Sequence, residues 1–400
     1  MHAYPVFLLI RGVGSFAAAA AFTLNLVYQI ETVGLGPLEL VLVGTVMEVS
    51  AFAAQVPTGV IADLYSRRLS VIIGYLLVGL GVLLQALVPE FAAIVVGNVI
   101  WGIGAVCVDG AEEAWISGEI DDAQVGDAFT RGAQVGQAAT VLGIGAAVAL
   151  AGVRLELPLL VGAICWLLLV CVLLAVMPER AFVPAQSRDL GSFVAMRAQV
   201  VDGARAVRGR GALICLLAAA FFLGLGSEGW DRLQQAHFLD NLTFPSFGTS
   251  VVWFGAMSVA SLVGSIALTQ IIRRHVDTLR PARLGRMLVV AQVVVVVGVV
   301  VFALAGEFWV AVAACLVVGL LRSASQPLFS TWMVAETEPR TRATVFSAAG
   351  QVDAAGQILG GPPVGLVGER LTIRIALVTT GLLAAPAIGM YVRALSHLRR

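Results

Sequence analysis

The sequence predicts an all-α integral membrane protein with twelve membrane-spanning helices in two bundles of six. Hydrophobic residues make up 59% of the 400-residue chain and charged residues only 12%, whereas soluble domains are about a quarter charged. The mean hydropathy is +0.94. Long apolar runs recur along the chain and are interrupted near its middle by one polar gap. The bilayer is therefore the solvent for most of the protein.

The apolar runs have the length of about 20 residues that a membrane-spanning helix needs. The first run has no basic segment before it and is too long for a signal peptide, which predicts a retained helix. The first six predicted helices cover residues 5–30, 37–58, 70–88, 91–117, 125–151 and 156–177. The second six cover residues 211–236, 246–272, 286–305, 307–333, 341–367 and 371–394.

The polar gap at residues 178–210 is predicted to be a cytoplasmic linker between an N-terminal bundle (1–177) and a C-terminal bundle (211–400). A surface amphipathic helix is expected at 191–208. All basic residues are arginine, and most fall on segments that are cytoplasmic if both termini are inside. Positive charge stays on the cytoplasmic side of membranes. These features predict a multi-pass cell-membrane protein with cytoplasmic termini. The arginine bias fits a GC-rich genome, and we expect a bacterial origin.

An internal repeat supports the division into two bundles. The segment 133–143 aligns with 350–360 at an offset of 217 residues, and the same offset places Trp115 on Trp332. Repeats of this kind are typical of transporters built from two related halves.

One turn between apolar runs is unusually rich in charge. Gly59, Asp63, Arg67 and Arg68 have the spacing G-x-x-x-D-x-x-x-R-R. This pattern resembles the loop signature of the major facilitator superfamily of transporters, between the second and third helices on the cytoplasmic side. The resemblance implies a twelve-helix fold that alternates access to a central small-molecule site.

The chain departs from the family pattern at several positions. Leu64 stands where a basic residue is common, and Ser66 where a glycine is common. In the fourth helix of the family's drug antiporters an arginine is common at the position of Asn98. The resemblance to the efflux branch is therefore weaker than the resemblance to the fold.

The residues of this turn are predicted to form a conformational gate. Gly59 would allow close approach of a neighbouring backbone, and Asp63 would hold a helix N-terminus. Arg67 and Arg68 would latch the two halves by pairing with a carboxylate at the end of the fourth helix. The candidate carboxylates are Glu119, Asp121 and Asp122. The alternative is that the arginines only anchor the topology.

Replacing Asp63 by asparagine should distinguish the two interpretations. A gate predicts that transport falls while membrane insertion and abundance are unchanged, because anchoring by arginines does not need this carboxylate. Flux and membrane abundance are measured on the same cells. Wild-type transport in the variant would favour the anchor.

Four ionisable residues lie deepest in the predicted helices: Glu48, Asp109, Arg322 and Asp353. Each costs at least about 2.5–3.5 kcal/mol on insertion scales, so each calls for a role. Arg322 and Asp353 are predicted to pair between neighbouring helices. The pair is either a structural ion pair or part of a substrate site, and the sequence leaves both open.

The densest acidic patch contains Asp109, Glu112 and Glu113. On one helix their spacing places Asp109 on the same face as the other two. Crowded carboxylates favour proton binding, as a proton carrier requires. Arg11 on the first helix is the expected counter-ion. Alternatively, Glu112 and Glu113 reach the cytoplasmic interface and are solvated.

Other polar residues are candidates for an outer gate or a cavity wall. Glu228 and Arg232 have the i, i+4 spacing of a helical ion pair, and an exposed helix end is the alternative. The remaining candidates are Asn25, Tyr28 and Gln29 on the first helix, Asp231 on the seventh, and Gln351 and Gln357 beside Asp353.

The favoured function is proton-coupled export of a hydrophobic or amphipathic small molecule by a monomer, with Glu48, Asp109 and Asp353 as candidate proton or cation sites. A symporter or uniporter importing a small metabolite is the alternative, and a non-transporting receptor or scaffold is a third class. No metal-ligand cluster, nucleotide loop or nucleophile–base arrangement is found in the sequence, and lysine is absent. We therefore expect no enzyme activity, cofactor, metal or nucleic-acid partner.

Overall fold

The computed structural model describes residues 2–182, 207, 209–275, 280–339 and 341–398, without the side chains of residues 56 and 60–64. Within these ranges every regular element is a helix, which confirms the predicted all-α fold. The predicted linker helix at 191–208 lies almost wholly outside the described residues.

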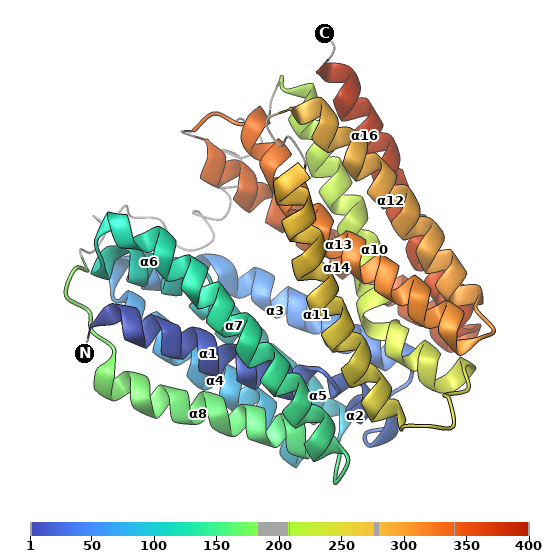
Figure 1. Cartoon of the computed structure of the whole chain (residues 1–400), viewed down its shortest axis with the longest axis horizontal. Coiled ribbons are helices and arrows are strands. Elements are labelled where there is room, and N and C mark those ends of the chain that lie inside the picture. The colour runs from blue at the N-terminus through green and yellow to red at the C-terminus, as the bar shows by residue number, and fades with distance from the viewer. Residues whose placement is uncertain (1, 183–206, 208, 276–279, 340, 399–400) are drawn as a thin grey trace. The chain divides into compact units, whose positions relative to one another are not determined.

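Eight helices precede the linker (Figure 1). They are α1 (Ala3–Phe22), α2 (Asn25–Glu31), α3 (Pro37–Leu64), α4 (Arg67–Leu87), α5 (Phe91–Val108), α6 (Ala111–Glu119), α7 (Asp122–Ala151) and α8 (Leu157–Val176). After the linker come α10 (Gly211–Asn241), α11 (Ser250–His275), α12 (Pro281–Leu304), α13 (Phe308–Glu336), α14 (Arg342–Arg370), α15 (Ile373–Ala384) and α16 (Pro386–His397).

The described helices agree with the twelve predicted spans. Eleven stretches are long and apolar enough to cross a membrane. The twelfth is α14, which has 29 residues but a more polar composition. Three spans are broken, between α1 and α2, α5 and α6, and α15 and α16. At the second break Gly110 has a φ of 73°, a conformation that favours glycine. At the third, Pro386 lacks the N–H of a continuous helix.

The chain divides into two compact units. The N-terminal unit comprises residues 1–35, 46–195 and 251–255, and the C-terminal unit comprises 36–45, 196–250 and 256–400. Helix α3 is one continuous helix, but it is divided between the two units. Its first residues, up to Thr45, belong to the C-terminal unit and the remainder to the N-terminal unit.

In the N-terminal unit α1 packs against α7 and α8, and α4 packs against α5 and α8 (Figure 1). One core cluster of this unit contains Ile10, Val71, Trp115 and Leu173, all at most 2% exposed. The indole nitrogen of Trp115 donates a hydrogen bond of 2.7 Å to the carbonyl of Pro178. This bond satisfies the polar atom of a buried aromatic side chain.

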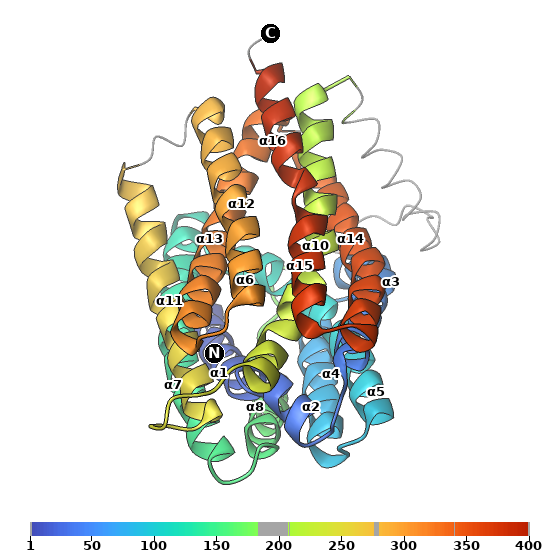
Figure 2. The ribbon, with the colours of Figure 1, turned by 90° about the vertical axis from the view of Figure 1, so that its right-hand side faces the viewer.

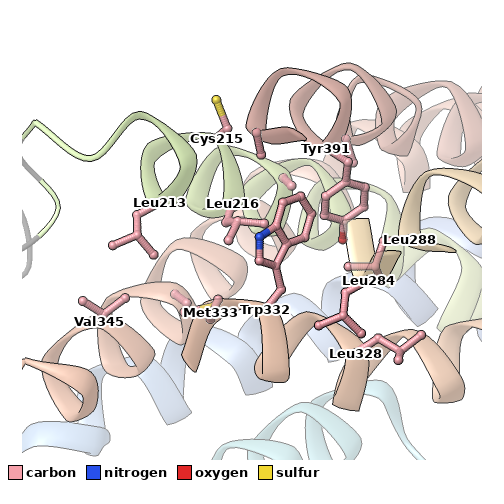
Figure 3. Packing of buried hydrophobic residues seen from close by; sticks show 14 of the residues in the cluster. Leu213, Cys215, Leu216, Leu284, Leu288, Leu328, Trp332, Met333, Val345 and Tyr391 are labelled. Atoms are coloured by element: carbon pink, nitrogen blue, oxygen red, sulfur yellow. The ribbon is translucent and has the colours of Figure 1, made fainter. Parts of the chain in front are cut away.

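In the C-terminal unit α10 packs against α14, α15 and α16, and α12 packs against α13, α15 and α16 (Figure 2). Trp332 and Tyr391 lie at the centre of the core cluster, with ring centroids 6.2 Å apart, and Leu216 and Leu284 pack around them (Figure 3). Trp115 and Trp332, which the 217-residue repeat aligns, are thus each central to a core.

Helices α10 and α14 meet backbone to backbone. A Cβ added at Gly360 would overlap the carbonyl oxygen of Leu225, and one at Gly356 would overlap that of Phe221. From the opposite side, a Cβ at Gly224 would overlap the carbonyl oxygen of Asp353. Small residues four apart allow membrane helices to approach this closely.

A second pair of glycines on α14 faces the beginning of α3, inside the C-terminal unit. A Cβ at Gly361 would lie 2.5 Å from the hydroxyl oxygen of Thr45, and one at Gly365 would lie 3.2 Å from Leu38. Helix α14 therefore carries two G-x-x-x-G faces, one for α10 and one for α3.

Candidate functional site

A cavity of about 370 Å³ lies inside the C-terminal unit. Helices α10, α12, α13, α14, α15 and α16 all contribute to its wall. Most of the wall is apolar or aromatic. The polar and charged members are Ser227, Asp231, Gln292, Arg322, Ser325, Gln326, Ser330, Asp353, Gln357 and Thr380. An apolar cavity of this size with a few convergent polar groups is typical of a small-molecule site.

A bidentate ion pair joins α10 to α13 in this wall. Arg322 donates from Nη1 to Oδ1 of Asp231 at 2.7 Å and from Nη2 to Oδ2 at 2.9 Å. The predicted pair between Arg322 and Asp353 is therefore wrong. A guanidinium group can donate two parallel hydrogen bonds to one carboxylate. Both terminal nitrogens of Arg322 are used in this way by Asp231.

Asp353 lines the same cavity with a different partner. Its Oδ2 accepts a hydrogen bond of 2.8 Å from Nε2 of Gln357, one turn along α14. Among the described residues no cationic side chain lies within ion-pair distance of Asp353. Asp353 is therefore a lining carboxylate without an ion pair to a described residue, in the same cavity wall as Arg322. Gln351, also predicted to flank Asp353, is half-buried on α14.

Glu228 and Arg232 form the predicted i, i+4 pair, with 2.8 Å between Oε1 and Nε. The two side chains are only 4% and 14% exposed, so the alternative of an exposed helix end is wrong. A Cβ added at Gly44 on α3 would overlap the Glu228 carboxylate. The pair is thus covered by the first part of α3, which belongs to the C-terminal unit.

The predicted acidic patch does not form one helical face. Helix α5 ends at Val108, so Asp109 is its C-cap residue whereas Glu113 lies on α6, and both side chains are exposed. Glu112 alone is buried, at 5% exposure. Its Oε2 accepts a 2.8 Å hydrogen bond from the hydroxyl of Tyr75.

Arg11 is the counter-ion of Glu112, as predicted, with 3.8 Å between Nη1 and Oε1. That distance is too long for a hydrogen bond, and Oε1 has no hydrogen-bond partner in the described structure. The interpretation that Glu112 is simply solvated is wrong. The carboxyl group lies inside the N-terminal unit with one oxygen bonded and one available.

The predicted gate lies on two helices and not on a long turn. Helix α3 continues through Leu64, and only Tyr65 and Ser66 separate it from α4. Ser66 is the N-cap residue of α4, because its hydroxyl accepts a hydrogen bond of 2.9 Å from the Leu69 N–H. A Cβ at Gly59 would meet no described atom within 4 Å, so the predicted close backbone approach is absent from the described residues.

The arginines of the gate bind other partners than those predicted. Arg67 donates from Nη1 to the carbonyl of Ala114 at 2.9 Å, and Arg68 donates from Nη2 to that of Leu174 at 2.7 Å. Glu179 accepts the Arg68 backbone N–H at 2.9 Å. Glu119, one predicted partner, instead accepts the backbone N–H groups of residues 180 and 181. The side chain of Asp63 lies outside the described residues.

The predicted cavity residues of the first span are buried in the N-terminal unit. Tyr28 donates a hydrogen bond of 2.7 Å to the carbonyl of Gln85. Asn25 and Gln29 are 7% and 0% exposed, and both Gln29 amide atoms lack hydrogen-bond partners in the described structure. Glu48 is half-buried on α3. None of these four residues lines the C-terminal cavity.

Several lining residues were not predicted. Ser325, Gln326 and Ser330 share one face of α13 with Arg322. Their spacing of three and four residues is the signal that could have identified them. Gln292 is a single polar residue in an apolar stretch, and no local pattern indicates it.

The family model of the Major Facilitator Superfamily matches residues 8–361. The chain therefore belongs to this superfamily and is a membrane transporter, not an enzyme. No curated protein matches the sequence.

The fold is also similar to solved transporter structures. A mutant of the nucleoside transporter NupG has a TM-score of 0.80 at 15% identity, over 98% of this chain and 100% of that chain. A POT family transporter has a TM-score of 0.76 at 12% identity, over 97% of this chain and 94% of that chain. A bacterial homolog of the human lysosomal transporter Spinster has a TM-score of 0.74 at 13% identity, over 99% of this chain and 96% of that chain. At these identities the likeness concerns the fold alone.

Proposed function

We propose that the protein is a secondary active transporter that alternates access to its cavity and exports a hydrophobic or amphipathic small molecule in exchange for protons. The observation that carries this proposal is the 370 Å³ cavity of the C-terminal unit. Most of its described wall is apolar or aromatic, and the wall contains Asp353, a carboxylate without an ion pair to a described residue. It works as a monomer in the cell membrane, with both termini in the cytoplasm.

The apolar wall supports an amphipathic substrate. Trp230, Phe329 and Phe346 line the cavity together with aliphatic residues of α12. Aromatic rings contribute large apolar contact areas and also attract cations over their faces. A substrate with a hydrophobic body and a basic group fits both features.

The charges of the wall support proton exchange at Asp353. Arg322 neutralises Asp231, and Arg232 neutralises the nearby Glu228. Asp353 is hydrogen-bonded only to an amide. Ionisable residues inside membrane proteins mark substrate pathways and proton relays. A proton and a cationic substrate would thus compete for one carboxylate, which couples their movements in opposite directions.

Glu112 is a second candidate for a proton site, in the N-terminal unit. Tyr75 and Arg11 surround its carboxyl group, and Oε1 has no hydrogen-bond partner in the described structure. Glu48, Asp109 and Glu113 stay weaker candidates because none of them lines the described cavity.

The second candidate function is import of a small polar metabolite. The polar face of α13 favours it, since Ser325, Gln326 and Ser330 offer hydrogen bonds to a hydroxylated solute. The similar structure of NupG is described as a nucleoside transporter, so nucleosides are the polar probes to test.

Flux into proteoliposomes, with and without a pH gradient, tests the proposal. We expect gradient-dependent transport of lipophilic amines. We expect Asp353→Asn to abolish the gradient dependence and to weaken amine binding, because an amide can neither exchange a proton nor pair with a cationic group. Glu307→Gln is the matched control, since this exposed carboxylate of the same unit does not line the cavity.

Three outcomes would contradict the proposal. Nucleoside flux without amine flux would favour the importer of polar metabolites. Amine flux that ignores the pH gradient in the wild type, or a gradient dependence unchanged in Asp353→Asn, would remove proton exchange at this residue.

A further inference from the structure

A second hollow of about 900 Å³ lies in the C-terminal unit between α11, α12 and α13, and of the residues that the structure describes it shares only Ser325 with the first cavity. We call it the arginine groove. Arg280, Arg283 and Arg286 lie at one end, and the rest of the wall is almost entirely apolar. No carboxylate is among the described lining residues. The substrate cavity and its proposed proton exchange do not explain this groove.

The arginines are placed to receive an anion. Arg280 is the N-cap residue of α12. The N-terminus of a helix favours negative charge through its free N–H groups and dipole. Arg283 is exposed and makes no side-chain hydrogen bond or ion pair to another described residue, and Arg286 donates from Nε to the Ala282 carbonyl at 3.2 Å.

The remainder of the groove suits a hydrocarbon chain. Val290 and Val294 on α12 are 63% and 38% exposed, and Leu268 and Leu321 face them from α11 and α13. Val294 lies about 16 Å along the helix axis from Arg283, at about 1.5 Å per residue. This length is close to half of the hydrocarbon core of about 30 Å, which is one leaflet.

We propose that the arginine groove binds one anionic glycerophospholipid, with its phosphate on Arg280, Arg283 and Arg286 and an acyl chain along the apolar wall. Guanidinium groups bind phosphate through paired hydrogen bonds. Basic pockets between membrane helices on the cytoplasmic side bind anionic headgroups, and this end of α12 is predicted to be cytoplasmic. A soluble anion would not need the apolar wall, and a neutral lipid would not need the arginines.

Native mass spectrometry of the delipidated full chain in detergent tests the proposal, with phosphatidylglycerol, phosphatidylcholine and water-soluble glycerophosphoglycerol as probes. We expect phosphatidylglycerol to bind most tightly. The triple variant Arg280→Gln/Arg283→Gln/Arg286→Gln should lower the affinity for phosphatidylglycerol about a hundredfold, since each arginine near an anionic headgroup contributes about fivefold to the affinity. Binding of phosphatidylcholine should not change.

Two further variants locate the site. Ala291→Phe should weaken the binding of phosphatidylglycerol, because the larger side chain fills the space beside the apolar wall while the arginines remain. Arg273→Gln/Arg274→Gln is the matched control, because these arginines end α11 but do not line the groove. If the triple variant does not fold, Arg283→Gln alone should weaken binding about fivefold.

Several results would overturn the proposal. The triple variant, or Arg283→Gln alone, could bind as tightly as the wild type. Arg273→Gln/Arg274→Gln could lose as much affinity as the triple variant, which would indicate a diffuse basic surface. Equal binding of phosphatidylcholine would leave only an apolar crevice, and equal binding of glycerophosphoglycerol would indicate a site for soluble phosphate esters.

Discussion

Replacing Gly360 by alanine is expected to destabilise the folded protein by about 3 kcal/mol, the upper end of the range for overpacking. The added Cβ would overlap the carbonyl oxygen of Leu225. Backbone atoms of two packed helices cannot move aside as a flexible side chain can. Unfolding in mixed micelles, followed by tryptophan fluorescence, measures the loss.

Gly350→Ala on the same helix is the control. A Cβ there meets no described atom within 4 Å. Alanine favours a helix over glycine by about 1 kcal/mol, so this variant should be as stable as the wild type or slightly more so. Equal stability of Gly360→Ala and the wild type would show that α10 and α14 can separate without cost.

Replacing Arg232 by methionine is expected to cost about 3–5 kcal/mol, because it leaves the buried carboxylate of Glu228 without its ion-pair partner. The double variant Glu228→Gln/Arg232→Met should recover most of this stability, since the uncompensated charge is then gone. The same unfolding measurement applies to both.

Arg131→Met is the matched control for burial. Arg131 and Asp127 are also an i, i+4 pair, at 3.2 Å, but their side chains are 63% and 55% exposed. An exposed pair contributes at most about 1 kcal/mol. Similar losses in Arg131→Met and Arg232→Met would mean that burial does not determine the contribution of Glu228 and Arg232.

Features that depend on bilayer thickness or local helical spacing could be predicted from the sequence. The helical spans follow from the length and hydropathy of the apolar runs. The Glu228–Arg232 pair follows from a spacing of four residues on one helix. Arg11 could be assigned to Glu112 because few other cations lie deep in the predicted N-terminal bundle.

Pairing between different helices could not be predicted in the same way. Depth along each helix placed Arg322 near Asp353, but the rotation of α10 about its axis brings Asp231 to Arg322 instead. The break at Gly110 was hidden in an apolar run, so the acidic patch was read as one continuous face. Such rotations and breaks are determined by tertiary packing, which a single sequence does not display.

The polar composition of α14 has a consequence for biogenesis. This helix carries Gln351, Asp353 and Gln357 near its middle, and it is the one long described helix after the linker that is too polar to count as a span by composition. A segment of this kind partitions poorly into lipid by itself. We therefore expect α14 to leave the translocon late and to enter the bilayer against the glycine surface of α10. Helix α10, which is synthesised about a hundred residues earlier, would then assist the membrane insertion of α14.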